Sequence, residues 1–201
     1  MINILLDKLP TEFEGYPINT DFRIGIQLTQ LFDDDSMTDQ EQFYCAVDLL
    51  FGYDGMTECP DPDTLKRGLE WFITGWYTDR IPESDKRKKK KQVPAFDYDI
   101  DQWRLYSAFL SQYHIDLNID DLHYWKFMGL LTTLDECSFT RVIDFRNKKP
   151  PANMKNEERQ KWNEQKMRYS LAPDLRETEE EKEERERLAA EFLKSVTIHK
   201  N

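Results

Sequence analysis

The stretch "IDDLHYWKFMGLLTTLD", residues 119–135, carries the strongest helical pattern in the chain. Its apolar residues recur three and four positions apart, which places them along one face of a helix. That face consists of Tyr124, Phe127, Met128, Leu131 and Leu134. Other faces of the same helix carry Leu122, Trp125 and Leu130. A helix that is apolar on most sides lies at the centre of a bundle, so this stretch predicts a mainly α-helical fold.

Further helical patterns precede this central stretch, and residues 21–78 are expected to form the N-terminal helices. Two of their starting points carry local capping signals. The Thr38 hydroxyl and the Glu41 carboxylate can form a capping box. Asp61 can cap a third helix that opens with Pro62, where the missing N–H group does no harm. These signals predict where two helices begin.

Residues 1–20 have a different pattern and are expected to form a small β-hairpin. The run "INILL" is rich in β-prone residues, and Gly15 and Pro17 are typical of a turn region. Helical periodicity takes over after residue 20.

A basic linker is expected at residues 79–96. Six adjacent cations at 86–91 repel one another and have nothing to bury. Such a run can bind nucleic acid by releasing counterions. The net charge of -11 argues against that partner, and a linker is the favoured interpretation.

Helical patterning returns in residues 97–171, which are expected to complete the same domain, with Asp99 and Gln102 as a further capping pair.

The last segment, residues 172–201, is expected to form an extended acidic helix. Between 174 and 187, eight acidic residues are opposed by four basic ones. A short apolar stripe follows at helical spacing, formed by Ala189, Phe192, Leu193 and Val196. These four residues are the candidate partner-binding site. The alternative is that they pack back onto the bundle. The predicted fold is therefore a mainly α-helical bundle with a small N-terminal β-hairpin and an extended acidic C-terminal helix.

Bulk composition limits the class of protein. The chain has 201 residues, of which 33% are charged and 13% aromatic, as expected of a packed helical domain with a charged surface. No stretch approaches the roughly 18 apolar residues of a membrane span, and the first residues lack the features of a signal peptide. Three scattered cysteines form neither a disulfide framework nor a zinc motif, and Cys45 is expected to be buried. A cytoplasmic location without a membrane partner is expected.

A metal-dependent enzyme is one hypothesis for the segment around residues 112–127. His114 and His123 lie nine positions apart, and with Asp116 they could hold a metal ion if they converged. Helical metal sites usually take paired ligands from positions three or four apart, and this segment has no such pair. No other catalytic motif is recognisable, and no cofactor is expected.

The favoured hypothesis for the same segment is structural. Asn118 can cap the following helix, and Asp120 and Asp121 would then complement the positive end of the helix dipole. His114 would lie in the last turn of the preceding helix, near free carbonyl groups. Each residue that could be catalytic therefore has a structural role.

Four segments resemble the bacteriophage gene-product-fifteen family of tailed-phage proteins. They are "MINILLDKLPTEFEGYPINTDFR" (1–23), "FLSQYHIDLNIDDLHYWKFMGLLTTL" (109–134), "IDFRNKK" (143–149) and "KMRYSL" (166–171). The resemblance extends from residue 1 to about 171. Its most specific part is the combination of "YPINTDFR" with "YHIDL" and "LHYWKF".

The resemblance implies a tail assembly chaperone that acts in the cytoplasm of the host bacterium. Such a protein binds the long helical tape-measure protein, or other tail proteins, and can also self-associate. The resemblance brings no catalytic motif to this chain, so a non-enzymatic function is expected. A structural protein of the tail, retained in the virion, is the first alternative, and the metal-dependent enzyme is the second.

Overall fold

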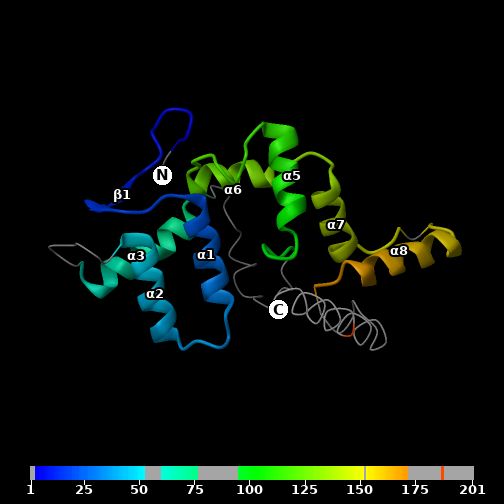
Figure 1. The fold of residues 1–201 in the computed structure, drawn as a ribbon, viewed down its shortest axis with the longest axis horizontal. Coiled ribbons are helices and arrows are strands. Elements are labelled where there is room, and N and C mark those ends of the chain that lie inside the picture. Colours follow the sequence, from blue (N-terminus) through cyan, green and yellow to red (C-terminus); the bar gives the residue numbers. More distant parts are fainter. Residues whose placement is uncertain (1–2, 53–59, 77–94, 152, 172–186, 188–201) are drawn as a thin grey trace, which may run out of the picture. The chain divides into compact units, whose positions relative to one another are not determined.

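The computed structural model describes residues 3–52, 60–76, 95–151, 153–171 and 187 (Figure 1). In this part of the chain it has seven helices and one two-stranded antiparallel hairpin, so the prediction of a mainly helical fold with an N-terminal hairpin is confirmed. The basic run, the acidic C-terminal segment and the apolar stripe within it lie outside the described residues.

Contacts divide the chain into two compact units. Unit 1 comprises Met1–Gln92 and Tyr106–Asp135, and unit 2 comprises Val93–Leu105 and Glu136–Asn201. Unit 1 contains β1 (Glu12–Phe13), β2 (Tyr16–Pro17), α1 (Phe22–Asp33), α2 (Asp39–Phe51), α3 (Pro62–Thr74), α6 (Tyr124–Thr132) and most of α5 (Gln102–Tyr113). Unit 2 contains the start of α5, α7 (Ser138–Asn147) and α8 (Asn156–Arg168). Within unit 1, α1 contacts α2, α3 and α6.

The predicted capping signals at the starts of α2 and α3 are confirmed, whereas the pair of Asp99 and Gln102 is not: α5 begins at Gln102, directly after Asp101, and the Gln102 side chain donates to the Asp99 carbonyl. At the start of α2 the Thr38 hydroxyl accepts a hydrogen bond from the Glu41 amide, and the Glu41 carboxylate accepts one from the Thr38 amide at 2.9 Å. At the start of α3 the Asp61 carboxylate accepts from the amides of Asp63 and Thr64, both at 3.0 Å. Both signals involve residues close in sequence, which is why the sequence predicted them correctly.

The hairpin is shorter than the pattern suggested. Its turn consists of Glu14 and Gly15, with φ angles of 50° and 86°, and two consecutive left-handed residues are typical of a two-residue hairpin loop. The described residues of the run "INILL", 3–6, do not form a strand: residues 4–6 form a turn, and Leu5 and Leu6 are 88% and 83% exposed. Apolar composition alone predicted a strand that has no partner to pair with.

Buried aromatic rings form the core of unit 1. Phe127 in α6 is fully buried and stacks on Phe22 and Phe109, with ring centroids 4.9 and 5.1 Å apart. Trp125 donates its indole N–H to the main-chain oxygen of Phe72 at 2.7 Å. The sequence correctly predicted a central position for α6, although this helix covers only part of residues 119–135.

Two elements of unit 1, α1 and α6, approach each other closely at Gly25. A Cβ atom added at Gly25 would lie 2.0 Å from Cδ2 of Tyr124, which is far inside van der Waals contact. The Tyr124 side chain is 2% exposed, so its ring has little room to move away. The absence of a side chain at Gly25 is therefore a condition for this packing.

The prediction of a buried Cys45 is wrong. Cys45 is a free, exposed cysteine in α2. The buried face of this helix is formed by Ala46, Val47 and Leu50, and Cys45 lies on another side.

None of the described helices is both long and apolar enough to span a membrane.

Candidate functional site

The predicted start of the central helix is wrong, and the correction concerns the candidate metal site. Asn118 belongs to a turn before the helix, and α6 begins only at Tyr124 with His123 as its N-cap. The cause is a long-range backbone pairing. The Phe22 amide donates to the Leu122 carbonyl, and the Tyr124 amide donates to the Thr20 carbonyl, each at 2.8 Å. This pairing keeps His123 extended, with φ of -65° and ψ of 136°, so the helix cannot start earlier.

Both ring nitrogens of His123 have partners within unit 1. Nδ1 accepts a hydrogen bond from the Trp125 amide at 3.0 Å, so Nε2 carries the proton and donates to the Pro10 carbonyl at 3.0 Å. Burial lowers the pKa of His123, and the bond to Pro10 opposes this effect only in part. The imidazole is therefore neutral at pH 7 and serves as a helix cap.

The three residues of the metal hypothesis do not come together. His114 is exposed and follows α5 with a left-handed φ of 57°. Asp116 accepts a hydrogen bond from the Asn118 amide at 2.9 Å. Among the residues that the structure describes, no group of three histidine, cysteine or acidic side chains could hold a metal ion. Asp116 and His123 thus make separate local contacts, and His114 is exposed.

Replacing His123 by asparagine is expected to flatten the pH dependence of stability. The folded chain holds the pKa of His123 below its ordinary value of 6.5, so in mildly acidic solution the unfolded chain binds a proton that the folded chain does not. The contribution of His123 to the free energy of unfolding is complete above about pH 6.5. It decreases as the pH falls towards the pKa that His123 has in the folded chain. Asparagine keeps a capping side chain but does not titrate.

Urea unfolding of the wild type and the His123→Asn variant between about pH 7.5 and pH 5 measures this effect. The matched control is His114→Asn, at an exposed left-handed position that asparagine tolerates. The control should keep the wild-type slope. An unchanged slope in His123→Asn would show that this half-buried imidazole is not responsible for the pH dependence.

A polar junction in unit 1 is centred on Arg23. Its guanidinium lies 2.9 Å from the Asp21 carboxylate and donates to the Leu117 carbonyl at 2.8 Å. It also lies over the Phe22 ring, 4.6 Å from the centroid. Together with the backbone pairing of residues 20–22, this junction joins three segments that carry the family resemblance, "YPINTDFR", "YHIDL" and "LHYWKF". Their residues therefore brace the fold.

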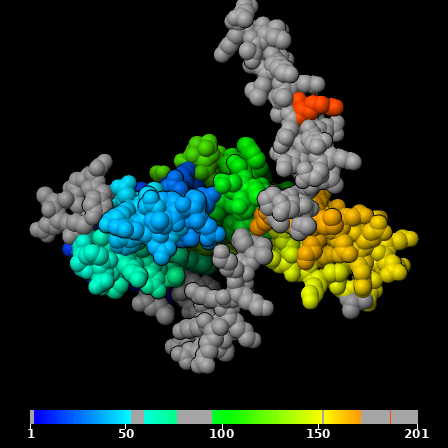
Figure 2. All heavy atoms as spheres, turned by 90° about the horizontal axis from the view of Figure 1, so that it is seen from below, coloured from blue at the N-terminus to red at the C-terminus, as the bar shows by residue number. Residues whose placement is uncertain are grey.

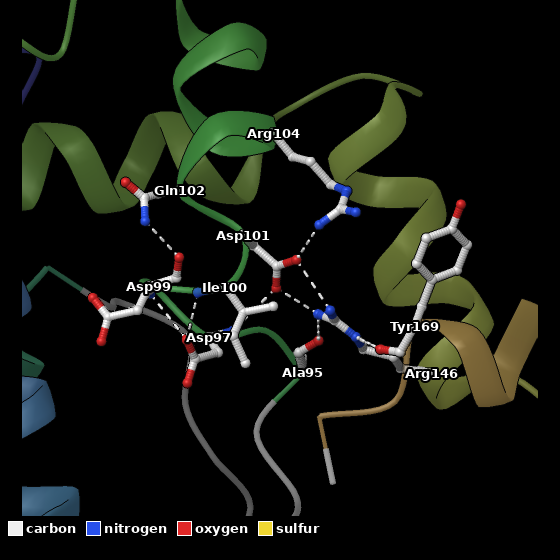
Figure 3. A network of polar contacts seen from close by, with 9 residues as sticks. All are labelled: Ala95, Asp97, Asp99, Ile100, Asp101, Gln102, Arg104, Arg146 and Tyr169. Atoms are coloured by element: carbon white, nitrogen blue, oxygen red, sulfur yellow. Dashed lines mark hydrogen bonds and ion pairs between the residues drawn. The ribbon is translucent and has the colours of Figure 1, made fainter. Parts of the chain in front are cut away.

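A second junction, in unit 2, is a buried ion pair between Asp101 and Arg146 (Figure 3). The two side chains are 1% and 6% exposed. The Arg146 guanidinium donates to both carboxylate oxygens, at 2.5 and 3.0 Å, which gives the bidentate geometry of a strong pair. Arg104 donates to the same carboxylate at 2.9 Å. The sequence pattern indicates neither partner, because 45 positions separate them.

The remaining contacts of Arg146 hold two other segments of unit 2. Its Nε donates to the Tyr169 carbonyl at 2.6 Å, and its Nη1 donates to the Ala95 carbonyl at 3.4 Å. Burial alone would raise the pKa of Asp101, but the bond from Arg146, the Asp97 amide and both arginine charges outweigh it and lower the pKa. The carboxylate is therefore ionised and fully engaged. This network joins the family segments "IDFRNKK" and "KMRYSL" and is a structural brace.

An open apolar groove lies on unit 1 between α2, α3 and the end of α1. We call it the α2–α3 groove; its volume is about 660 Å³. Its apolar lining consists of Phe32, Phe43, Leu69 and Ile73, and its polar rim consists of Asp39, Gln40, Gln42, Lys66, Glu70 and Thr74. Figures 1 and 2 show α2 and α3 side by side, and in Figure 2 they reach the surface in light blue and blue-green. Phe32 remains 44% exposed.

The sequence alone does not predict this groove. Phe32 occurs in the apolar pattern of residues 21–34, and periodicity does not distinguish a ring that lines an open surface from one in the core. The predicted partner-binding residues, Ala189, Phe192, Leu193 and Val196, lie outside the described residues and stay a prediction.

The described chain is thus a helical protein whose polar clusters brace its fold and whose open feature is an apolar groove. Residues 5–171 match the family described as Bacteriophage Gp15 protein, and the chain belongs to this family. Membership indicates a phage structural or morphogenesis protein. Comparisons with curated proteins and with solved structures find no match.

Proposed function

We propose that the protein is a non-enzymatic tail assembly chaperone that binds the phage tape-measure protein in the host cytoplasm. The observation that carries this proposal is the family match over residues 5–171. The resemblance on which the family is recognised implies a tail-assembly role. The assignment of the tape-measure protein as the binding partner is our own proposal.

The physical properties of the chain are compatible with this role. A tape-measure protein exposes long apolar helical stripes, which aggregate unless another surface covers them. The present chain offers the α2–α3 groove on unit 1 and a net charge of -11. An apolar groove can cover an amphipathic helix, and a large net charge keeps the resulting complex soluble.

Coexpression with the product of the neighbouring tape-measure gene tests the proposal. We expect the soluble fraction of the tape-measure protein to increase, and the two chains to elute together in size-exclusion chromatography. The control is coexpression with an unrelated acidic helical protein of similar size. An equal soluble fraction in both cases, with no complex, would contradict the chaperone proposal.

A structural protein of the finished tail is the alternative, because the family also admits that role. Mass spectrometry of purified phage particles separates the two. A chaperone is absent from mature tails, whereas a structural protein is present in a fixed ratio to the tail-tube subunit.

A further inference from the structure

We propose that the α2–α3 groove binds an amphipathic helix of the tape-measure protein, whose apolar stripe is bordered by lysine or arginine. This inference rests on the proposed function and adds the surface and the chemistry of the bound segment. It assigns the contact to unit 1 and not to the predicted C-terminal stripe.

The shape of the groove suits the apolar side of a helix. Its volume of about 660 Å³ lies within the range of about 300–1,000 Å³ that is common for binding pockets. Phe32, Phe43 and Ile73 line it, and none of these three side chains is fully buried. Apolar side chains spaced three and four positions apart on a partner helix can enter such a groove together. The apolar side chains of the partner helix would then cover Phe32, which is 44% exposed.

The charges around the groove favour a basic partner. The rim carries the acidic residues Asp39 and Glu70 and the single base Lys66. The adjacent α1–α2 connection adds Asp34, which hydrogen bonds from Ser36 hold at a lowered pKa, and Asp35. The net charge at this end of the groove is therefore negative. Opposite charges on a partner would speed its association and select against acidic competitors.

The same charges disfavour this chain as the occupant. Residues 174–187, which precede the predicted apolar stripe, contain eight acids against four bases. A second copy of the chain would bring a net charge of -11. Residues 188–201 carry Glu191 against Lys194 and Lys200, so the repulsion from this chain would come from the acidic residues directly before the stripe, and that from a second copy would come from its net charge. A basic helical segment meets no such repulsion.

The test uses labelled overlapping peptides of the tape-measure protein, each about 25 residues or roughly 37 Å of helix. Fluorescence anisotropy measures their binding to the full-length wild type and to two variants. Phe32→Ser is expected to weaken the tightest peptide by about tenfold or more, as for a central apolar contact. The control is Leu110→Ser in α5 of unit 1, because Leu110 is 41% exposed and does not line the groove. The control should bind as the wild type does.

A second pair of variants tests the charge argument without touching apolar residues. Glu70→Lys on the rim and Asp121→Lys, away from it, change the net charge equally, and both positions are exposed. We expect only Glu70→Lys to weaken binding several-fold at low salt. The difference should vanish near about 1 M salt, where the screening length falls to about 3 Å.

The outcomes separate the two proposals. If the wild type binds tape-measure peptides and both groove variants bind equally well, the groove is not the site, although the chaperone function stands. If neither the peptides nor the full-length tape-measure protein bind, the function itself fails, and the assigned occupant fails with it. If a peptide of residues 188–201 binds the groove more tightly than any tape-measure peptide, the occupant is this chain and the inference is overturned.

Discussion

Replacing Arg146 by methionine is expected to lower the free energy of unfolding by about 3–5 kcal/mol, the usual cost of removing one partner from a buried ion pair. Asp101, at 1% exposure, would keep its charge without its bidentate partner. The carbonyl of Tyr169 would lose the donor that lies 2.6 Å away. Urea unfolding followed by circular dichroism measures the loss, and hydrogen exchange should localise it to α7 and α8.

The matched control is Arg141→Met in the same helix. Arg141 forms an ion pair with Glu136 in which the two side chains are 63% and 81% exposed, and such pairs contribute little. We expect a change within about 0.5 kcal/mol. An equal effect of the two substitutions would contradict the role assigned to the buried pair.

A double variant separates the charge from the packing. In Arg146→Met combined with Asp101→Asn, the buried carboxylate charge that lost its bidentate partner is also removed, so the two losses should not add. The double variant is expected to be more stable than the sum of the single losses predicts. Full additivity would show that Arg146 acts only through its carbonyl contacts.

Replacing Gly25 by alanine is expected to lower the free energy of unfolding by about 3 kcal/mol. This value lies in the upper part of the range for overpacked cores. The new methyl group would lie 2.0 Å from the Tyr124 ring, and α1 would have to move away from α6. The measurement is again the free energy of unfolding in urea.

Gly129→Ala is the control for this prediction. Gly129 lies within α6, and no atom lies within 4 Å of a Cβ added there. Alanine in an open helical position stabilises by roughly 0.5–1 kcal/mol relative to glycine. The two substitutions should therefore have opposite signs. A loss in both would show that the effect belongs to the helix backbone and not to the Tyr124 contact.

The sequence predicted those parts of the fold that depend on neighbouring residues. The capping box of Thr38 and Glu41 and the Asp61 cap were predicted correctly, because each bond joins residues two or three positions apart. The start of α6 was predicted wrongly, because Asn118 is a good local cap but residues 20–22 pair with residues 122–124. A distant strand-like contact overrode the local signal.

The polar junctions could not be predicted from the sequence. Asp101 is one of 39 acidic residues, and nothing local marks it as the partner of Arg146. The segments that carry the family resemblance include Arg146 and Tyr169 but do not indicate that the two meet. The α2–α3 groove also depends on how three consecutive helices pack against one another, which a periodic pattern does not contain.

The contact between Arg146 and Tyr169 has a practical consequence for protein engineering. Arg146 holds residue 169 by its main-chain oxygen, and the final acidic segment begins only three positions later. A reporter protein or affinity tag fused after residue 171 therefore keeps the hydrogen bond between Arg146 and the carbonyl of residue 169. A fusion point before residue 169 removes the Tyr169 carbonyl, so the Nε of Arg146 loses this acceptor.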